Sequence, residues 1–228
     1  MWRKIMAEVK VKALVWSEFT EPKDIYPKGI HGDITEYLNS CGDVEAKSAQ
    51  LADPEQGVSE AMLKWADVLI WWGHQKHRDV TDESVQRIVK RVKEEGMGYF
   101  AIHSAHYSRG LIALLGTSCG LGSVGDGGAE SISVVAPNHP ITKGIKDFKI
   151  PRTEYFGEPF DVPEPEAVVF RSTFEKGDNI WFRSGCCWTV GKGRVFYFRP
   201  GHETFPIMRQ PEVQKVIYNA TLWSANRT

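Results

Sequence analysis

Two short runs of consecutive apolar residues, 68–72 (VLIWW) and 99–102 (YFAI), constrain the fold more than any other feature of this chain. Strands without polar alternation are typical of a parallel sheet that is covered on both faces. Between the runs, Thr81 suits a helix N-cap, and the apolar residues after it recur at helical spacing (Val85, Ile88, Val89 and Val92). A strand, a helix and a second strand in this order predict a parallel sheet with right-handed crossovers, and therefore an α/β fold.

The two halves of the chain have different patterns. In the first half, residues 9–16 and 44–49 are typical of strands, residues 61–65 of a short helix, and a helix around Ile34 ends at Gly42. In the second half, residues 116–128 are rich in glycine and are predicted to form an irregular loop. Short strands at 132–136, 167–170, 180–182, 187–190 and 194–198 indicate an antiparallel extension, and Pro211 opens a final helix. No linker interrupts this pattern, so we expect a single domain over residues 1–228.

Charge and cysteine usage exclude several classes of protein. A formal net charge of −1 gives no bulk attraction to nucleic acid or to a membrane surface. The first ten residues (MWRKIMAEVK) lack the apolar core of a signal peptide, and no apolar run approaches the roughly 20 residues that cross a bilayer. Cys41, Cys119, Cys186 and Cys187 form no C-x-x-C pair, so we expect reduced, structural thiols. These features predict a cytoplasmic protein and leave a homo-oligomer open.

All seven histidines come after strand-like apolar runs. They are His31, His74, His77, His103, His106, His139 and His202. Ligands of an open α/β sheet bind beyond the carboxyl ends of its strands. Imidazole is the commonest proton shuttle and metal ligand near neutral pH. The sequence therefore predicts that titratable chemistry gathers on one rim of the sheet.

The segment 98–107 (GYFAIHSAHY) carries the most specific signal. A buried strand ends in small and polar residues and turns at once into a helix, which is the context of a nucleophile elbow. Ser104 is then a candidate nucleophile, with His103 or His106 as its base. The glycines of a G-x-S-x-G elbow are missing here, which weighs against that role.

Three further segments place candidate groups near strand ends. In 198–205 (FRPGHETF), His202 and Glu203 form an acid/base or ligand pair. In 71–77 (WWGHQKH), His74 and His77 follow a glycine that lets the backbone turn. In 153–160 (TEYFGEPF), Glu154 and Glu158 flank Tyr155.

These segments, together with 138–145 (NHPITKGI), resemble the trehalose-utilisation, or ThuA-like, family over nearly the whole chain. The resemblance implies the class I glutamine-amidotransferase-like superfamily, and with it a flavodoxin-like three-layer sandwich whose central sheet is mainly parallel. In amidotransferases the elbow carries a nucleophilic cysteine. His103 overlays that cysteine, and His202-Glu203 falls near the late His and Glu of the superfamily. Imidazole cannot replace a thiolate as a stable acyl acceptor, so glutaminase activity is not expected.

With this fold, His74, His103, His202 and Glu203 approach one pocket that Glu154 could close. Three imidazoles and a carboxylate suit Zn²⁺ or a similar divalent metal, with His74, His103, Glu154 and His202 as ligands. Without a metal, His103, His202 and Glu203 suit general acid/base catalysis. The family association implies a disaccharide or keto-sugar substrate of the trehalose type. Its ring would contact the predicted substrate-binding residues Trp72, His106, Tyr155, Glu158 and Phe205.

Four of the histidines also have purely structural interpretations. His139 suits a turn, His31 a solvated loop, His77 a wet helix start, and His106 a histidine of the core. Residues 120–128 lack the ending of a phosphate-binding loop and are predicted to be flexible. Two alternative functions also remain: a non-catalytic sugar-binding or regulatory protein on the same scaffold, and a hydrolase that uses Ser104.

Overall fold

The computed structural model describes residues 10–227 of the chain. The strands are β1 (Val11–Ser17), β2 (Val44–Gln50), β3 (Val68–Trp72), β4 (Gly98–Ile102), β5 (Leu121–Val134), β6 (Phe148–Phe160), β7 (Ala167–Phe174), β8 (Trp181–Val190) and β9 (Gly193–Phe198). The helices are α1 (Gly29–Ser40), α2 (Glu60–Trp65), α3 (Asp82–Glu95), α4 (Arg109–Leu115) and α5 (Pro211–Ser224). Short 3₁₀ turns, including η2 (His77–Asp79) and η3 (His103–Tyr107), complete the described chain.

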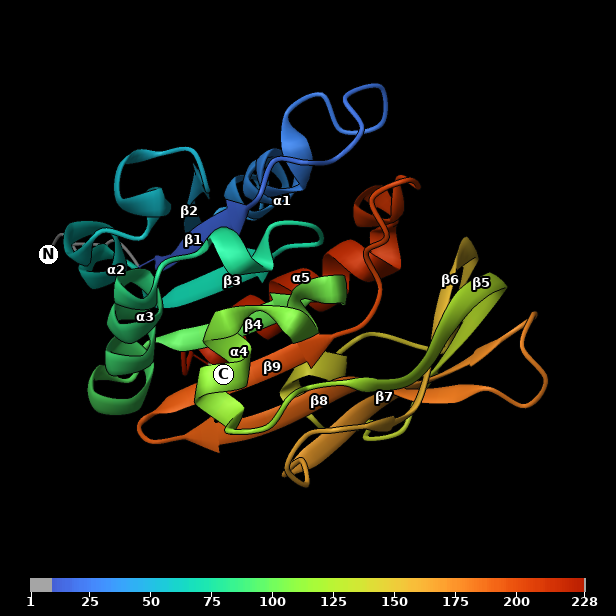
Figure 1. Cartoon of the computed structure of the whole chain (residues 1–228). Coiled ribbons are helices and arrows are strands. Elements are labelled where there is room, and N and C mark those ends of the chain that lie inside the picture. Colours follow the sequence, from blue (N-terminus) through green and yellow to red (C-terminus); the bar gives the residue numbers. More distant parts are fainter. Residues whose placement is uncertain (1–9, 228) are drawn as a thin grey trace, which may run out of the picture.

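Within residues 10–227, nine strands form one sheet in the order β2-β1-β3-β4-β9-β8-β7-β5-β6 (Figure 1). The strands β2, β1, β3, β4 and β9 pair in parallel. Their order is that of a doubly wound sheet in which β9 takes the last place. The remaining pairings, from β9 outward through β8, β7 and β5 to β6, are antiparallel. The α/β fold is confirmed, but the sheet is mixed and not mainly parallel.

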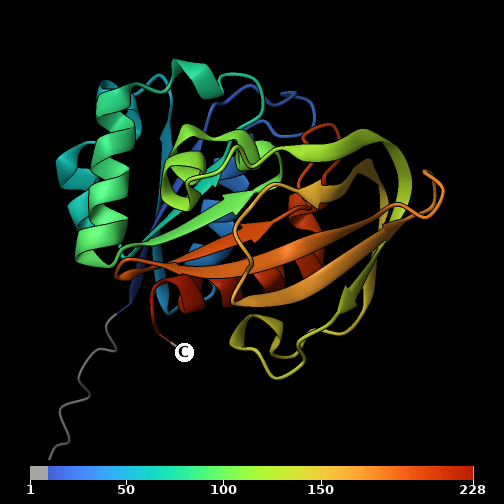
Figure 2. The same ribbon diagram turned by 60° about the horizontal axis from the view of Figure 1, so that its bottom comes forward.

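Helices cover both faces of the parallel half (Figure 2). The helices α1 and α5 pack on one face with residues such as Ile70 and Phe100, and α2, α3 and α4 pack on the other with Leu69 and Tyr99. Every residue of β3 and β4 is buried, as the unbroken apolar runs predict. Trp72 packs on the face covered by α1 and α5. Because side chains alternate along a strand, Trp71 packs on the opposite face.

The helix between β3 and β4 has the ends that its sequence predicts. The Thr81 hydroxyl accepts a hydrogen bond from the Ser84 amide, and Asp82 and Glu83 lie in the first turn. Gly96 ends the helix at φ 82°, a left-handed conformation that glycine adopts without steric cost. The ends of α3 therefore fix the spacing between the two buried strands.

The glycine-rich segment 116–128 is not a loop throughout, because β5 begins at Leu121. A side chain at Gly122 would lie 2.3 Å from the Glu158 carbonyl oxygen, and one at Gly127 would lie 2.9 Å from the Tyr155 amide nitrogen. The glycines thus allow β5 and β6 to approach closely, which is the usual meaning of glycine inside a strand. The prediction of a flexible loop over 120–128 was wrong for this reason.

His31 does not lie in a solvated loop, which is one of the interpretations that the sequence allows. The helix α1 begins at Gly29, and His31 lies in its first turn with 7 % of its surface exposed. The prediction that residues 1–10 lack a signal peptide concerns mainly residues 1–9, which lie outside the described range, as does the predicted start of the first strand. No helix between residues 10 and 227 is long and apolar enough to cross a membrane.

Candidate active site

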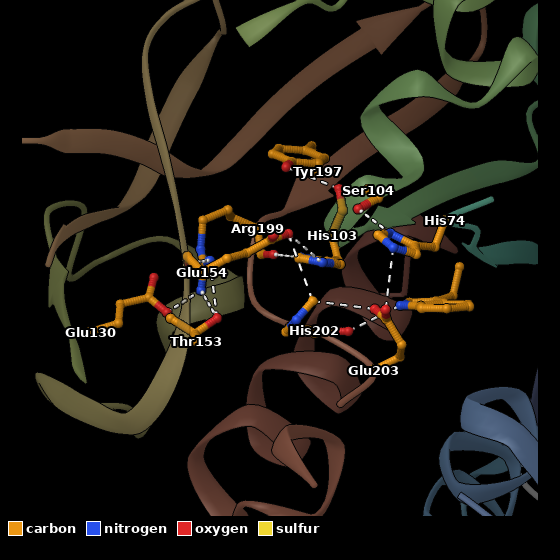
Figure 3. A network of polar contacts seen from close by, with 12 residues as sticks. His74, His103, Ser104, Glu130, Thr153, Glu154, Tyr197, Arg199, His202 and Glu203 are labelled. Carbon is orange, nitrogen blue, oxygen red and sulfur yellow. Dashed lines mark hydrogen bonds and ion pairs between the residues drawn. The ribbon is translucent and has the colours of Figure 1, made fainter. Parts of the chain in front are cut away.

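Three histidines and two glutamates meet beyond the carboxyl ends of the parallel strands (Figure 3). His74 follows β3, His103 follows β4, and His202 and Glu203 follow β9, while Glu154 comes from β6. The ring centroids of His103 and His202 are 5.4 Å apart, and each lies 6.2 Å from that of His74. The predicted gathering of histidines at one rim is therefore present for these three.

His103 occupies the sharp turn between β4 and η3. Its φ of 56° is unusual for a residue with a side chain, as at a nucleophile elbow. The ring is fully buried and stacks on Phe156 at a centroid distance of 5.1 Å. Its Nδ1 lies 3.0 Å from the Arg199 carbonyl oxygen. A carbonyl can only accept a hydrogen bond, so Nδ1 is protonated and is the donor. Burial lowers the pKa of His103, because the charged form loses solvation.

Glu154 stands between His103 and His202. Its Oε1 lies 3.1 Å from His103 Nε2 and 3.7 Å from His202 Nδ1. Both nitrogens are buried, and neither has a hydrogen-bond partner within the described residues. Burial would raise the pKa of Glu154, but contacts with the two histidines and the charge of Arg199 outweigh it and lower the pKa. These three atoms are close enough to one another to hold one metal ion.

His74 connects Ser104 to Glu203. The His74 Nε2 lies 3.2 Å from Glu203 Oε1, and its Nδ1 lies 3.0 Å from Ser104 Oγ. If Nε2–H donates to the carboxylate, Nδ1 is free to accept the hydroxyl proton of Ser104. The sequence suggested His103 or His106 as the base for Ser104, whereas the structure places His74 there. Ser104 is 6 % exposed.

His202 and Glu203 form the second half of the cluster. Their atoms Nδ1 and Oε2 are 3.3 Å apart. Burial raises the pKa of Glu203, but the contact with His202, a backbone amide and the neighbouring imidazoles together lower it to about 2. Burial also lowers the pKa of His202, yet the two glutamates outweigh burial and raise it. The pair therefore favours a carboxylate beside a histidine that gains a proton readily.

A hydrogen bond from strand β3 holds the loop that carries His202. The Trp72 indole donates a hydrogen bond of 3.1 Å to the Gly201 carbonyl. Trp72 is only 1 % exposed, so its ring supports the pocket and is not available as a stacking surface. Phe205 is half-buried, with its ring 5.6 Å from that of His202, which suits the predicted contact with a substrate.

The other predicted substrate-binding residues lie away from the cluster or are already bonded. Tyr155 is on the opposite face of β6 from Glu154 and packs against Phe174. Glu158 forms an ion pair of 2.9 Å with Arg183. His106 is buried, and its Nδ1–H donates to the Cys119 carbonyl at 2.8 Å.

The three remaining histidines have local partners. His31 Nδ1 lies 2.7 Å from the Ser17 hydroxyl. His139 accepts a hydrogen bond from the Ile141 amide, as expected of a turn residue. His77 Nδ1 lies 3.5 Å from the buried carboxylate of Glu18. None of them belongs to the groups of described residues that could hold a metal ion.

Arg199, Glu130 and Phe156 support the cluster but were not predicted. Arg199 is fully buried and forms an ion pair with the equally buried Glu130, and its Nη1 donates to the Glu154 carbonyl at 2.8 Å. Arg199 directly follows the buried strand β9, and a charged residue at such a position was the available signal. Glu130 lay hidden because it adjoins the glycine-rich segment that was predicted to be a loop.

Comparison with known proteins identifies the family and the fold. The sequence model of the ThuA family, described as trehalose utilisation, matches residues 12–224. A search of the curated proteins finds no match. A ThuA-like protein from Parabacteroides merdae is 14 % identical, with a TM-score of 0.71 over 95 % of this chain and 90 % of that one. A ThuA-like protein from Bacteroides uniformis is 16 % identical, with a TM-score of 0.68 over 98 % and 95 %. A glutamine amidotransferase from Thermotoga maritima is 15 % identical, with a TM-score of 0.55 over 96 % and 99 %. At these identities the likeness shows the shared fold.

Proposed function

Since the chain belongs to the ThuA family of trehalose utilisation, we propose that it acts in sugar catabolism on a disaccharide or keto-sugar. The reaction takes place at the cluster of His74, His103, Glu154, His202 and Glu203. The observation that carries the proposal is the meeting of these five side chains from four separate segments at the carboxyl rim of the sheet. Ligands of doubly wound sheets bind at this rim.

We further propose that His103, Glu154 and His202 hold a divalent cation. The Nδ1 of His103 donates to the Arg199 carbonyl, so a neutral ring directs a lone pair from Nε2 toward a carboxylate. Two acceptors 3.1 Å apart repel each other unless a cation or a proton lies between them. Ligands of a tetrahedral Zn²⁺ with bonds of about 2.0–2.1 Å lie about 3.3 Å apart, which is close to the spacing here. A carbonyl that fixes the other ring nitrogen is the usual support of a metal-binding histidine.

In this assignment His74 and Glu203 supply acid/base chemistry. Glu203 stays ionised because its pKa is about 2, and it orients the His74 ring through Nε2. His74 is 27 % exposed, so a substrate hydroxyl can reach it. The cation would polarise a substrate carbonyl or hydroxyl oxygen when bound. Glutaminase activity is not part of the proposal, because His103 stands at the elbow position.

Metal content and sugar turnover test the proposal together. The purified protein is analysed by inductively coupled plasma mass spectrometry, and turnover of trehalose and of its keto derivatives is followed by chromatography. We expect about one divalent ion per chain, and loss of both the ion and turnover in His202→Ala. His139→Asn is the matched control, since asparagine keeps an acceptor for the Ile141 amide far from the cluster. Turnover that survives in both His103→Ala and His202→Ala would overturn the assigned roles.

A second candidate function is a hydrolase with Ser104 as nucleophile. The line from Ser104 Oγ through His74 to Glu203 has the connectivity of a nucleophile, a base and an orienting carboxylate, with contacts of 3.0 and 3.2 Å. Against it, Ser104 is 6 % exposed and follows the elbow position, which His103 occupies.

The serine mechanism predicts a covalent adduct. A fluorophosphonate probe should add to Ser104, and mass spectrometry of the labelled peptide would locate the adduct. Ser104→Ala should abolish labelling and turnover in this mechanism. Unchanged turnover in Ser104→Ala, together with an unlabelled wild-type protein, would leave only the mechanism based on His74 and the cation.

A further inference from the structure

A cavity lies beside the segment that follows His74, and none of its lining residues belongs to the histidine cluster. It has a volume of about 730 Å³, within the usual range of small-molecule sites. It is lined by Gln75, His77, Arg78, Asp79, Tyr107, Arg109 and Ile112. Two short segments build most of it, namely residues 75–79 after His74 and Tyr107 at the end of η3.

The cavity and the cluster share the segments that form them. Gln75 directly follows His74, and Tyr107 lies three residues after Ser104 in the 3₁₀ helix η3. Side chains at positions i and i+3 of a 3₁₀ helix lie one above the other. Tyr107 therefore stands over Ser104, whose hydroxyl contacts the His74 ring at 3.0 Å. One end of a ligand in the cavity would therefore lie near Ser104 and His74.

Tyr107 offers an aromatic surface in the lining of the cavity. It is 45 % exposed, one of the few large apolar side chains of the described chain that faces solvent to this extent. Its ring is braced by His106 at a centroid distance of 3.9 Å and by His77 at 6.4 Å. A held ring with one free face is suited to stacking, since little side-chain entropy remains to be lost.

The polar groups of the cavity suit a neutral ligand with many hydroxyls. Among residues 10–227, the side chains of Gln75, Arg78 and Asp79 make no hydrogen bond to the protein, so both donors and acceptors are available. The charges of Arg78 and Asp79 offset each other. Arg109 is occupied by Asp82 and by the Val80 carbonyl. The lining therefore has no excess positive charge that would favour a phosphorylated sugar.

We propose that this cavity binds the second pyranose ring of a disaccharide whose first ring occupies the histidine cluster. Tyr107 stacks on the apolar face of the second ring, and Gln75 and Asp79 bind its hydroxyls. The inference rests on the proposed function, and it adds that the protein prefers a disaccharide to the corresponding monosaccharide.

Calorimetric titration with trehalose and with glucose tests the inference. We expect wild-type protein to bind trehalose at least tenfold more tightly than glucose. Tyr107→Ala should lose about tenfold in trehalose affinity, because tenfold corresponds to about 1.4 kcal/mol, within the range of an aromatic contact. Its glucose affinity should stay unchanged. Tyr107→Phe, which keeps the ring, should bind both sugars almost as the wild type does.

The outcomes separate this inference from the proposed function. If Tyr107→Ala binds trehalose as tightly as the wild type, or loses affinity for both sugars equally, the second subsite is refuted while sugar binding at the cluster stands. If the wild type binds neither trehalose nor glucose, the proposed function and the inference both fail for this class of sugar. Circular dichroism of each variant confirms that a loss of binding is not a loss of fold.

Discussion

Arg199 and Glu130 form an ion pair in which neither side chain has any exposed surface. Glu130 also accepts a hydrogen bond from the Ser172 hydroxyl. The Arg199 guanidinium carbon lies 5.7 Å from the ring centroid of Phe156 and 5.3 Å from that of Phe174. Arg199 follows β9, the last parallel strand, whereas Glu130 belongs to β5 in the antiparallel extension. The pair thus joins the two halves of the sheet directly behind the histidine cluster.

Removal of one partner of this pair should destabilise the protein strongly. Arg199→Met leaves the Glu130 carboxylate buried without its partner, which costs about 3–5 kcal/mol. The double variant Arg199→Met with Glu130→Met should recover most of that loss, because two apolar side chains need no solvation. Urea unfolding followed by fluorescence gives the free energies. If the free energy of unfolding of Arg199→Met lies within about 1 kcal/mol of the wild-type value, the ion pair contributes little to stability.

The same two variants separate stability from the arrangement of the site. Arg199 donates to the Glu154 carbonyl at 2.8 Å, a contact that methionine cannot make. The double variant should therefore unfold near the wild-type free energy and still bind the divalent ion more weakly. Equal metal affinity in the double variant and the wild type would mean that the guanidinium does not position Glu154.

Two buried histidines should make stability depend on pH. Burial lowers the pKa of His31 to about 4 and that of His106 to about 3, both below the value of about 6.5 expected in the unfolded chain. Between these limits the unfolded chain binds protons that the folded protein does not. The stabilisation is therefore complete above about pH 6.5 and is lost as the pH falls toward the folded-state pKa values.

The size of this effect can be measured by substitution. Each of the two histidines should lower the free energy of unfolding by about 2 kcal/mol at pH 5 relative to pH 7. The free energy of unfolding of His31→Asn and of His106→Asn should fall less between pH 7 and pH 5 than that of the wild type. All other titrating groups are common to the compared proteins and cancel. Parallel pH profiles for the wild type and both variants would contradict the assigned pKa shifts.

Glu18 should hold the segment that carries His74. Its buried carboxylate accepts a hydrogen bond of 2.7 Å from the Gln75 amide, and its other oxygen faces His77. Glu18→Ala should therefore speed hydrogen exchange at the Gln75 amide and lower stability by about 1–3 kcal/mol. Glu18→Gln keeps an acceptor oxygen and should preserve most of the protection. Exchange at Gln75 that is the same in all three proteins would show that the segment is held by other contacts.

The parts of the fold that the sequence predicts are those in which local pattern and burial agree. The runs at β3 and β4 and the capped helix α3 form as their residues predict, because each pattern has a single stable solution in a covered parallel sheet. The prediction found only the end of strand β5, at 132–134, and missed its glycine-rich first part. Glycines lower strand propensity, and only the approach of β6 explains them. That approach is a tertiary contact with no local signal.

In the candidate site, too, some residues could be predicted from local sequence and others could not. His74, His103 and His202 were expected together because each comes soon after a strand-like apolar run and because the family resemblance implies one pocket for them. Tyr155 and Glu158 were chosen for their neighbours in sequence, but alternation along β6 turns Tyr155 away from Glu154, and Arg183 occupies Glu158. The buried Arg199–Glu130 pair joins positions 69 residues apart, so no local pattern could reveal it.

Gly201 should be the least replaceable glycine near the cluster. Its φ is 139°, and a β-carbon there would lie 2.6 Å from Met208 Cε and 3.2 Å from His103 Cβ. Gly201→Ala should therefore move the loop that carries His202, weaken metal binding and lower stability by more than the cost of backbone strain alone. Gly42→Ala is the matched control, because Gly42 also has a positive φ, 85°, but no atom within 4 Å of the added carbon. That variant should lose about 1–2 kcal/mol through strain alone and keep full metal affinity. If urea unfolding and metal titration give the same losses for both variants, the packing of Gly201 against His103 does not determine the geometry of the site.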